Sequence, residues 1–231
     1  MRVIGTETVR RAGLTARVLG VAVVTVAALL AAPVAASAAG CPDVEVVFAR
    51  GTFEPPGVGA TGQQFVDALG SQIGGRSLDV YPVNYPASTD FPTAADGVID
   101  ASNHVRATAA NCPTTKMVLG GYSQGAAVIG YVTAARVPSG YTLPAGLAGP
   151  MPLDVANHVA AVALLGKPSN AFLESVDAPP IVIGPRYAGK TIDLCADGDP
   201  VCSTGNDNGA HTLYASNGMA AQAAGFAARH L

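Results

Sequence analysis

The chain has 231 residues, of which 49% are hydrophobic and 13% are charged, and its formal net charge is −3. Residues 1–39 hold four of the 13 basic and one of the 16 acidic residues, so nine basic and 15 acidic residues remain beyond them. An acidic chain of this kind does not attract nucleic acid or an anionic membrane surface electrostatically. The remaining roughly 190 residues suffice for one domain with a single hydrophobic core.

The N-terminal stretch has the composition of a secretory signal. Arginines precede an apolar run, Val18 to Ala32, and small residues follow from Ala35 to Ala39. Because a membrane-spanning helix needs about 20 apolar residues, a retained membrane anchor is the weaker alternative. We therefore expect residues 1–39 to be a cleaved signal peptide. Residues 40–231 are expected to form one secreted domain, extracellular or associated with the cell wall.

Apolar patterning beyond the signal predicts alternating strands and helices. Short apolar runs that are typical of strands lie at residues 43–50, 78–83, 117–119 and 160–165, with minor candidates at 181–183 and 191–194. Helical patterning or composition follows at residues 62–73, 94–110, 124–135 and 216–230. Buried strands that alternate with helices imply a three-layer α/β/α sandwich around a central, mainly parallel sheet.

Four cysteines lie beyond the signal, and an even number in an oxidising compartment favours disulfides. Cys195 and Cys202 are close enough in sequence to close a small loop. That pairing leaves Cys41 and Cys112 for the second disulfide. A zinc site is the alternative, but the C-x2-C or nearby histidine spacing of such sites is absent. We therefore expect two disulfides and no bound metal.

Residues 121–125, Gly-Tyr-Ser-Gln-Gly, have the G-x-S-x-G pattern of a nucleophile elbow. The bare pattern also arises by chance, but here an apolar strand precedes it and a buried helix follows it, as the elbow requires. Side chains at Gly121 and Gly125 would collide where the strand and the helix run close together. Ser123 is the candidate nucleophile, and the N–H of Gln124 is a candidate donor to an oxyanion.

A serine nucleophile needs a histidine base, and the base needs an acid that orients it. His211 lies in a late polar loop, which suits the Ser–acid–His order of elbow enzymes. The other histidines lie where structural or surface roles are expected, namely His104, His158 and His230. Among the acids between the serine and His211, spacing favours Asp197 and Asp199 without choosing between them.

Several segments together resemble the cutinase family, most closely the cutinase-like esterases of mycobacteria and related actinobacteria. They are the signal, the first cysteine, V-V-F-A-R-G-T, G-Y-S-Q-G, and the loop C-A-D-G-D-P-V-C with a histidine shortly after it. The resemblance covers nearly the whole mature chain. It implies a triad of Ser123, His211 and Asp199, with Thr52 as a second oxyanion donor. Phe53, where the family commonly has a small residue, is a departure that bears on substrate range.

The resemblance also implies an α/β-hydrolase-like fold of cutinase type without a long lid. We expect hydrolysis of short- to medium-chain acyl esters through an acyl-enzyme on Ser123, without a cofactor, on lipid, polyester or acylated polysaccharide substrates. Acetylxylan esterase, phospholipase, thioesterase and acyltransferase activities use the same chemistry. A catalytically silent surface-binding protein is the alternative of a different class. We expect a monomer with no nucleic acid partner and no stable membrane insertion.

Overall fold

The computed structural model describes residues 40–137, 139, 142–143, 145–147 and 149–231. The expected signal peptide, residues 1–39, lies outside the described residues. Among the described residues, no helix combines the length and the apolar character that crossing a membrane requires.

Five strands form one sheet with the order β2-β1-β3-β4-β5, and every neighbouring pair is parallel. Their bounds are β1 (Val44–Ala49), β2 (Leu78–Pro82), β3 (Lys116–Tyr122), β4 (Val159–Leu165) and β5 (Thr191–Leu194). β1 is buried along its whole length and β4 along nearly all of it, as expected for strands that are covered on both faces. The predicted parallel sheet is confirmed.

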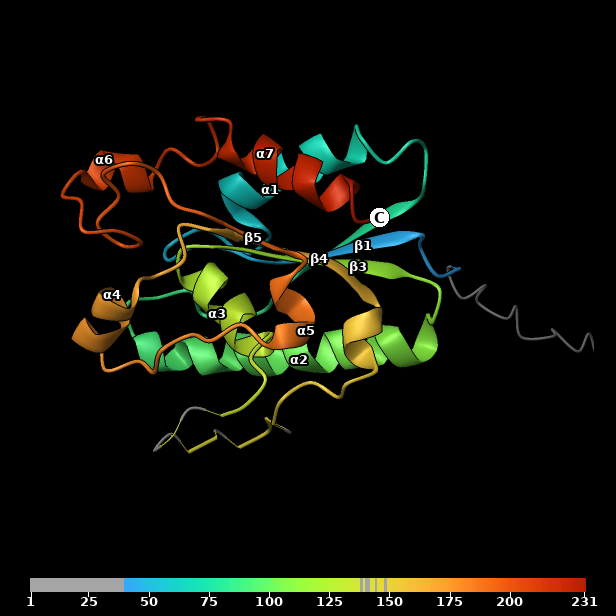
Figure 1. The fold of residues 1–231 in the computed structure, drawn as a ribbon, viewed down its shortest axis with the longest axis horizontal. Helices are drawn as coiled ribbons and strands as arrows, with labels where there is room; N and C mark the ends of the chain where they lie inside the picture. Colours follow the sequence, from blue (N-terminus) through green and yellow to red (C-terminus); the bar gives the residue numbers. More distant parts are fainter. Residues whose placement is uncertain (1–39, 138, 140–141, 144, 148) are drawn as a thin grey trace, which may run out of the picture. The chain divides into compact units, whose positions relative to one another are not determined.

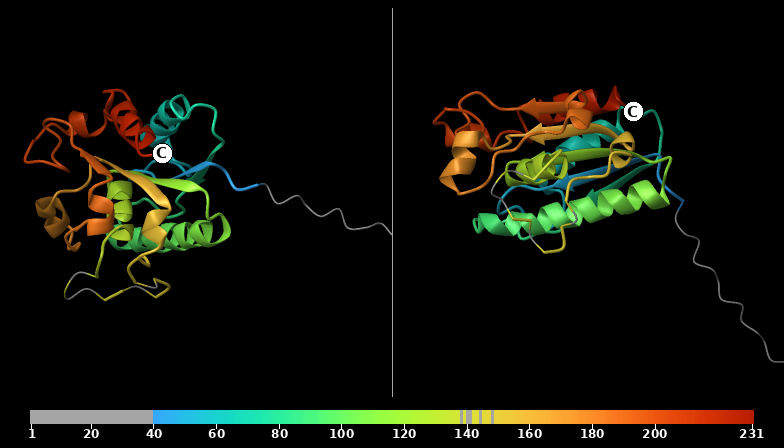
Figure 2. Two further views of the ribbon diagram at one scale, coloured as in Figure 1. Left: turned by 45° about the vertical axis from the view of Figure 1, so that its right-hand side comes forward. Right: turned by 60° about the horizontal axis from the view of Figure 1, so that its bottom comes forward.

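Helices cover both faces of this sheet, as Figure 1 shows. The helices α1 (Gly59–Gly70) and α7 (Met219–Ala228) lie on one face, and α2 (Ala94–Asn111), α3 (Gln124–Val132) and α5 (Pro185–Ala188) lie on the other. Figure 2 shows the same layers from two further directions. Each layer has its own apolar core, around Phe48 and Phe65 on the first face and around Leu119 and Ile129 on the second. The predicted three-layer sandwich is therefore confirmed.

Some local predictions are corrected by the structure. Residues 181–183 do not form a strand, because only Ile183 makes an isolated antiparallel bridge, to Ala134. The two residues before them, Pro179 and Pro180, have no N–H to donate to a ladder. Besides α5, four short helical segments were not predicted, since fewer than two turns show no clear periodicity. They are η1 (Phe91–Thr93), η2 (Val155–Asn157), α4 (Asn170–Ser175) and α6 (Asn208–His211).

Both predicted disulfides are present. Cys41–Cys112 joins the residues before β1 to the end of α2, and Cys195–Cys202 closes the loop that follows β5. Because all strands are parallel, their carboxyl ends meet at one edge of the sheet. The loops after β1, β3 and β5 therefore converge there, which is where ligands bind in open α/β sheets.

Candidate active site

Ser123 lies in the tight turn between β3 and α3. Its backbone has φ +55° and ψ −120°, a left-handed conformation that costs a non-glycine residue about 1–3 kcal/mol. Its N–H donates to the carbonyl of Leu165 at the end of β4, at 2.9 Å. This bond ties the strained turn to the neighbouring strand.

The two glycines of the motif are required by the backbone around them. A Cβ on Gly121 would lie 2.3 Å from the carbonyl oxygen of Gly125, and a Cβ on Gly125 would lie 1.9 Å from the carbonyl oxygen of Ala49. Real Cβ atoms essentially never come so close to another heavy atom, and backbone atoms have little freedom to move away. The expected collision between strand and helix is confirmed, and β1 takes part in it as well.

The structure brings Ser123, His211 and Asp199 together. His211 Nε2 lies 2.8 Å from Ser123 Oγ, and His211 Nδ1 lies 2.7 Å from Asp199 Oδ2. Asp199 is fully buried, whereas the histidine side chain remains partly accessible. His211 is the last residue of α6 rather than a loop residue, which corrects its predicted setting. The arrangement allows a proton to pass from the serine to an imidazole that the carboxylate orients.

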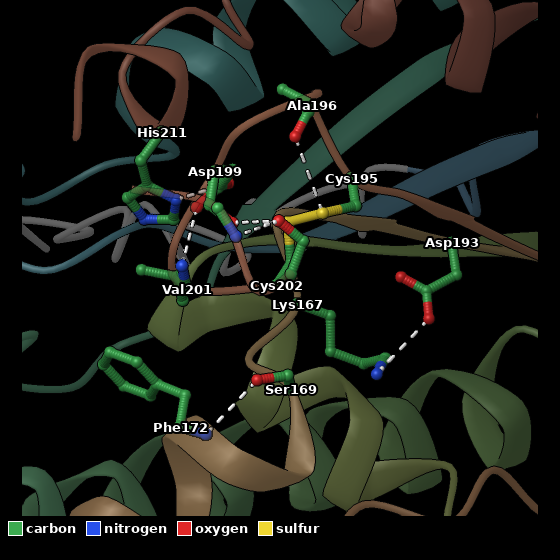
Figure 3. The surroundings of a disulfide bond; sticks show 12 residues. Lys167, Ser169, Phe172, Asp193, Cys195, Ala196, Asp199, Val201, Cys202 and His211 are labelled. Carbon is green, nitrogen blue, oxygen red and sulfur yellow. Dashed lines mark hydrogen bonds and ion pairs between the residues drawn. A yellow bond between two sulfur atoms is a disulfide. The ribbon is translucent and has the colours of Figure 1, made fainter. Parts of the chain in front are cut away.

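Of the two acids that spacing left open, Asp199 faces His211, whereas Asp197 is exposed. Figure 3 shows Asp199 beside the Cys195–Cys202 disulfide, with the N–H of Val201 donating to its Oδ1 at 2.8 Å. Burial alone would raise the pKa of Asp199. The hydrogen bonds from His211, Tyr214 and Val201 outweigh burial and lower this pKa below its usual value. The carboxylate is thus kept ionised next to the imidazole.

Two tyrosines that sequence reasoning missed complete the surroundings of the triad. The phenol of Tyr214 donates to Asp199 Oδ2 at 2.7 Å and accepts the N–H of Ala196 at 2.8 Å. The phenol of Tyr122 donates to the carbonyl of His211, and the two rings lie 5.4 Å apart. Burial is the main cause that raises the pKa of Tyr122 to about 12. Burial also raises the pKa of Tyr214, so both phenols remain neutral hydrogen-bond donors at physiological pH.

The two candidate oxyanion donors lie in the turns that follow adjacent strands. Gln124 is the first residue of α3, where backbone N–H groups have no partner within the helix. β1 pairs with β3 so that Ala49 stands opposite Gly121. Thr52, three residues after Ala49, therefore follows β1 at the same edge at which Ser123 follows β3. This placement is compatible with two N–H donors near one substrate carbonyl.

The residues at this edge do not fit a metal centre. In the part of the chain that the structure describes, one group brings three metal-ligating side chains together: Cys195, Asp199 and Cys202. Both sulfur atoms are joined in a disulfide, so neither is a thiolate that binds a metal. The carboxylate of this group already accepts hydrogen bonds from His211 and Tyr214.

Comparison with known proteins identifies relatives of this chain. The family model for cutinase matches residues 40–231. "Probable carboxylesterase Culp5" of Mycobacterium tuberculosis is 62% identical over 169 residues, which cover 73% of this chain and 96% of that protein. "Phospholipase Culp4" of the same species is 48% identical over 225 residues, which cover 96% of this chain and 95% of that protein.

A solved structure shows the same fold. The Trichoderma reesei cutinase in complex with a C11Y4 phosphonate inhibitor superimposes with a TM-score of 0.61 at 32% identity, over 82% of this chain and 77% of that one. The match of the family model extends over the whole described sandwich, including the loop that carries Asp199. The chain therefore belongs to the cutinase family and is a carboxylic ester hydrolase.

Proposed function

We propose that this chain is a secreted serine esterase that hydrolyses short- to medium-chain acyl esters through an acyl-enzyme on Ser123. The observation that carries the proposal is the 2.8 Å separation of Ser123 Oγ and His211 Nε2, with His211 Nδ1 held 2.7 Å from a buried carboxylate of Asp199. A serine hydroxyl becomes nucleophilic when a base oriented in this way removes its proton.

In the acylation step, Ser123 Oγ attacks the ester carbonyl carbon while His211 Nε2 accepts the hydroxyl proton. The carbonyl oxygen becomes an oxyanion that accepts hydrogen bonds from the N–H groups of Gln124 and Thr52. One such donor typically contributes about 3–4 kcal/mol to the transition state. His211 then donates its proton to the alkoxy oxygen, the C–O bond breaks, and the alcohol leaves.

In the deacylation step, a water molecule takes the place of the alcohol. His211 Nε2 accepts a proton from the water as its oxygen attacks the acyl carbon. Collapse of the second tetrahedral intermediate returns the proton to Ser123 Oγ and releases the carboxylic acid. Asp199 stays ionised throughout and stabilises the imidazolium that forms in both steps.

The test compares Ser123→Ala with the wild type in the hydrolysis of p-nitrophenyl butyrate. We expect kcat to fall at least roughly 10⁴-fold, since the remaining groups cannot supply a nucleophile. Ser175→Ala, which removes an exposed hydroxyl on α4, is the matched control and should keep full activity. Most of the hydrolysis surviving in Ser123→Ala would reject the assignment. A fluorophosphonate probe that does not label Ser123 in the wild type would instead favour the catalytically silent alternative.

Phospholipase activity is the second candidate, because a relative that aligns over nearly the full length of both chains is named a phospholipase. A series of p-nitrophenyl esters from acetate to palmitate separates the candidates. Activity that persists at long chains favours a lipid hydrolase, and a strong preference for acetate favours an esterase of acetylated polysaccharide. An assay on phosphatidylcholine vesicles then tests the phospholipase directly.

We propose further that the enzyme acts outside the cell as a monomer. Two disulfides support an oxidising compartment. N-terminal sequencing of protein recovered from the culture medium tests cleavage near residue 39, and its elution volume on size exclusion tests the monomer.

A further inference from the structure

The backbone of Phe53 disfavours the folded chain, and its side chain contributes little to stability. Its side chain is 77% exposed, the highest value among the large hydrophobic residues that the structure describes. Its backbone has φ +65°, in the left-handed region that favours glycine. A glycine or an asparagine would suit this position better than a phenylalanine whose ring remains in water.

The loop around Phe53 is nevertheless held firmly. The N–H of Phe53 donates to the carbonyl of Ala87 at 2.7 Å, and Ala87 is itself a buried residue with φ +50°. The carboxylate of Glu54 accepts the N–H of Gly51 at 2.6 Å and the N–H of Ala60, at the start of α1, at 2.7 Å. Phe53 is therefore fixed from both sides rather than being the tip of a free loop.

A buried arginine joins this loop to the one that follows β2. The guanidinium of Arg50 donates to the carbonyl of Glu54 at 2.8 Å and to the carbonyl of Tyr85 at 2.7 Å. Arg50 is only 5% exposed, and burying its charge costs free energy. These carbonyls and the ring of Tyr85, whose centroid lies 5.1 Å from the guanidinium carbon, offset that cost. Arg50 thus links the two loops directly.

The same two loops contact the residues on either side of Ser123. The ring of Tyr122, the residue before it, lies against Gly51, because a Cβ on that glycine would lie 2.7 Å from the ring. The side-chain amide of Gln124, the residue after it, donates to the carbonyl of Ser88 at 2.9 Å. The N–H of Phe53 donates to the carbonyl of Ala87, next to Ser88, so Phe53 lies in the pair of loops that borders the candidate active site.

We propose that Phe53 determines substrate specificity by presenting its exposed ring to an uncharged alkyl arm of the ester. This inference rests on the proposed function. The ring makes little use of its apolar surface within the fold, and a strained position persists where the surroundings enforce it, commonly at sites of function. The 15 acidic and nine basic residues beyond the signal favour an uncharged arm over an anionic one. An alkyl chain covering the ring removes apolar surface of both partners from water.

The experiment measures kcat/KM for Phe53→Ala and Phe53→Gly on two series of soluble esters below their aggregation concentrations. One series lengthens the acyl arm from p-nitrophenyl acetate to octanoate, and the other lengthens the alcohol arm from ethyl to hexyl butyrate. Leu153→Ala is the matched control. Leu153 is 66% exposed, but it precedes β4 and so lies at the opposite edge of the sheet.

We expect kcat/KM of both Phe53 variants to fall about tenfold at the long end of one series and less than twofold on acetate. Burying one methylene fully raises an affinity or a kcat/KM about fourfold, and a contact on one side only raises it less. Several methylenes lying against one face of the ring therefore account for the expected difference of about tenfold. The series that responds identifies the arm. The control should match the wild type throughout, and Phe53→Gly should have a raised Tm because glycine adopts φ +65° without strain.

An equal loss of kcat/KM on all esters would overturn the proposal, because it would mean that Phe53 only positions its neighbour Thr52, the candidate oxyanion donor. Unchanged kcat/KM in both series, or a lowered Tm in both variants, would also overturn it. A wild-type protein without esterase activity would instead refute the proposed function, and the two failures are thereby distinguished.

Discussion

Tyr214 donates a hydrogen bond to the same carboxylate oxygen of Asp199 that faces His211, and both distances are 2.7 Å. The tyrosine is fully buried, and its oxygen is held in turn by the N–H of Ala196. The phenol therefore helps to fix the carboxylate in the orientation that faces His211. It also stabilises the charged form of Asp199, which lowers the pKa of that group.

Replacing Tyr214 by Phe should lower kcat several-fold and move the acid limb of the pH–activity profile to higher pH. Without the phenol the pKa of Asp199 rises, so the carboxylate that orients His211 is lost at a higher pH than in the wild type. The measurement is kcat/KM for p-nitrophenyl acetate as a function of pH. An acid limb that stays in place, despite an intact fold, would show that Tyr214 is only a packing residue.

The same substitution should lower stability at neutral pH and make stability less dependent on acid than in the wild type. Because the folded pKa of Asp199 is depressed, its contribution to stability is present at neutral pH and is lost as the pH falls through that folded pKa. In Tyr214→Phe the contribution is smaller, and the N–H of Ala196 loses its acceptor, which costs about 1–3 kcal/mol. Urea unfolding at neutral and acid pH measures both effects. Tyr131→Phe is the matched control, because the phenol of Tyr131 donates to the carbonyl of Pro179 and not to Asp199.

Replacing Asp199 by Asn should reduce kcat by roughly 10³–10⁴-fold while leaving KM nearly unchanged, because the amide no longer holds the imidazole in the reactive tautomer. Asp197→Asn is a close control, since it makes the same change in the same loop at an exposed position. Single-turnover and steady-state rates on one ester measure both variants. If Asp197→Asn caused the larger loss, the assignment of the acid would be wrong.

The turn around Ser123 could be predicted from sequence because its constraints are local. The glycines of G-x-S-x-G are dictated by backbone atoms that lie 1.9 Å and 2.3 Å from where a Cβ would stand. Any chain with this turn therefore needs glycine at these two positions. The strands and long helices were predictable for a similar reason, because a strand that is buried on both faces leaves a short apolar run and a helix that is buried on one face leaves a periodic apolar pattern.

The choice between Asp197 and Asp199 was not open to spacing arguments. Gly198, which stands between them, has φ +84° and turns the chain, so that one neighbour is exposed and the other is fully buried. Neither the turn nor its direction follows from the order of the residues, and the family resemblance made the choice. Tyr122 and Tyr214 were missed because their roles depend on contacts between separate loops, which leave no pattern in sequence.

Replacing Gly125 by Ala should destabilise the protein by several kcal/mol, because the new methyl group would overlap the carbonyl of Ala49 at the end of β1. We expect a lowered Tm together with loss of fluorophosphonate labelling, since the strand and the helix must separate. Gly189→Ala is the matched control, because no heavy atom lies within 4 Å of its added Cβ. Equal Tm values for the two variants would contradict the steric account of the motif.

The two disulfides should have separable effects on stability and on activity. Cys41–Cys112 links residues 71 apart, and Cys195–Cys202 links residues 7 apart. Loop-closure entropy then predicts a stabilisation of about 4 kcal/mol for the first and about 2.5 kcal/mol for the second. We therefore expect the double Cys→Ser variant of the long pair to lose more stability in urea unfolding.

Activity should show the reverse order. The short disulfide closes the loop that holds Asp199 against His211, as Figure 3 shows, whereas the long one lies at the start of β1 and the end of α2. Removing Cys195–Cys202 should therefore lower kcat severalfold at temperatures where the protein is still folded. Removing Cys41–Cys112 should leave kcat close to that of the wild type below the transition. Unchanged turnover after verified loss of the short disulfide would mean that the hydrogen bonds of Asp199 hold the loop by themselves.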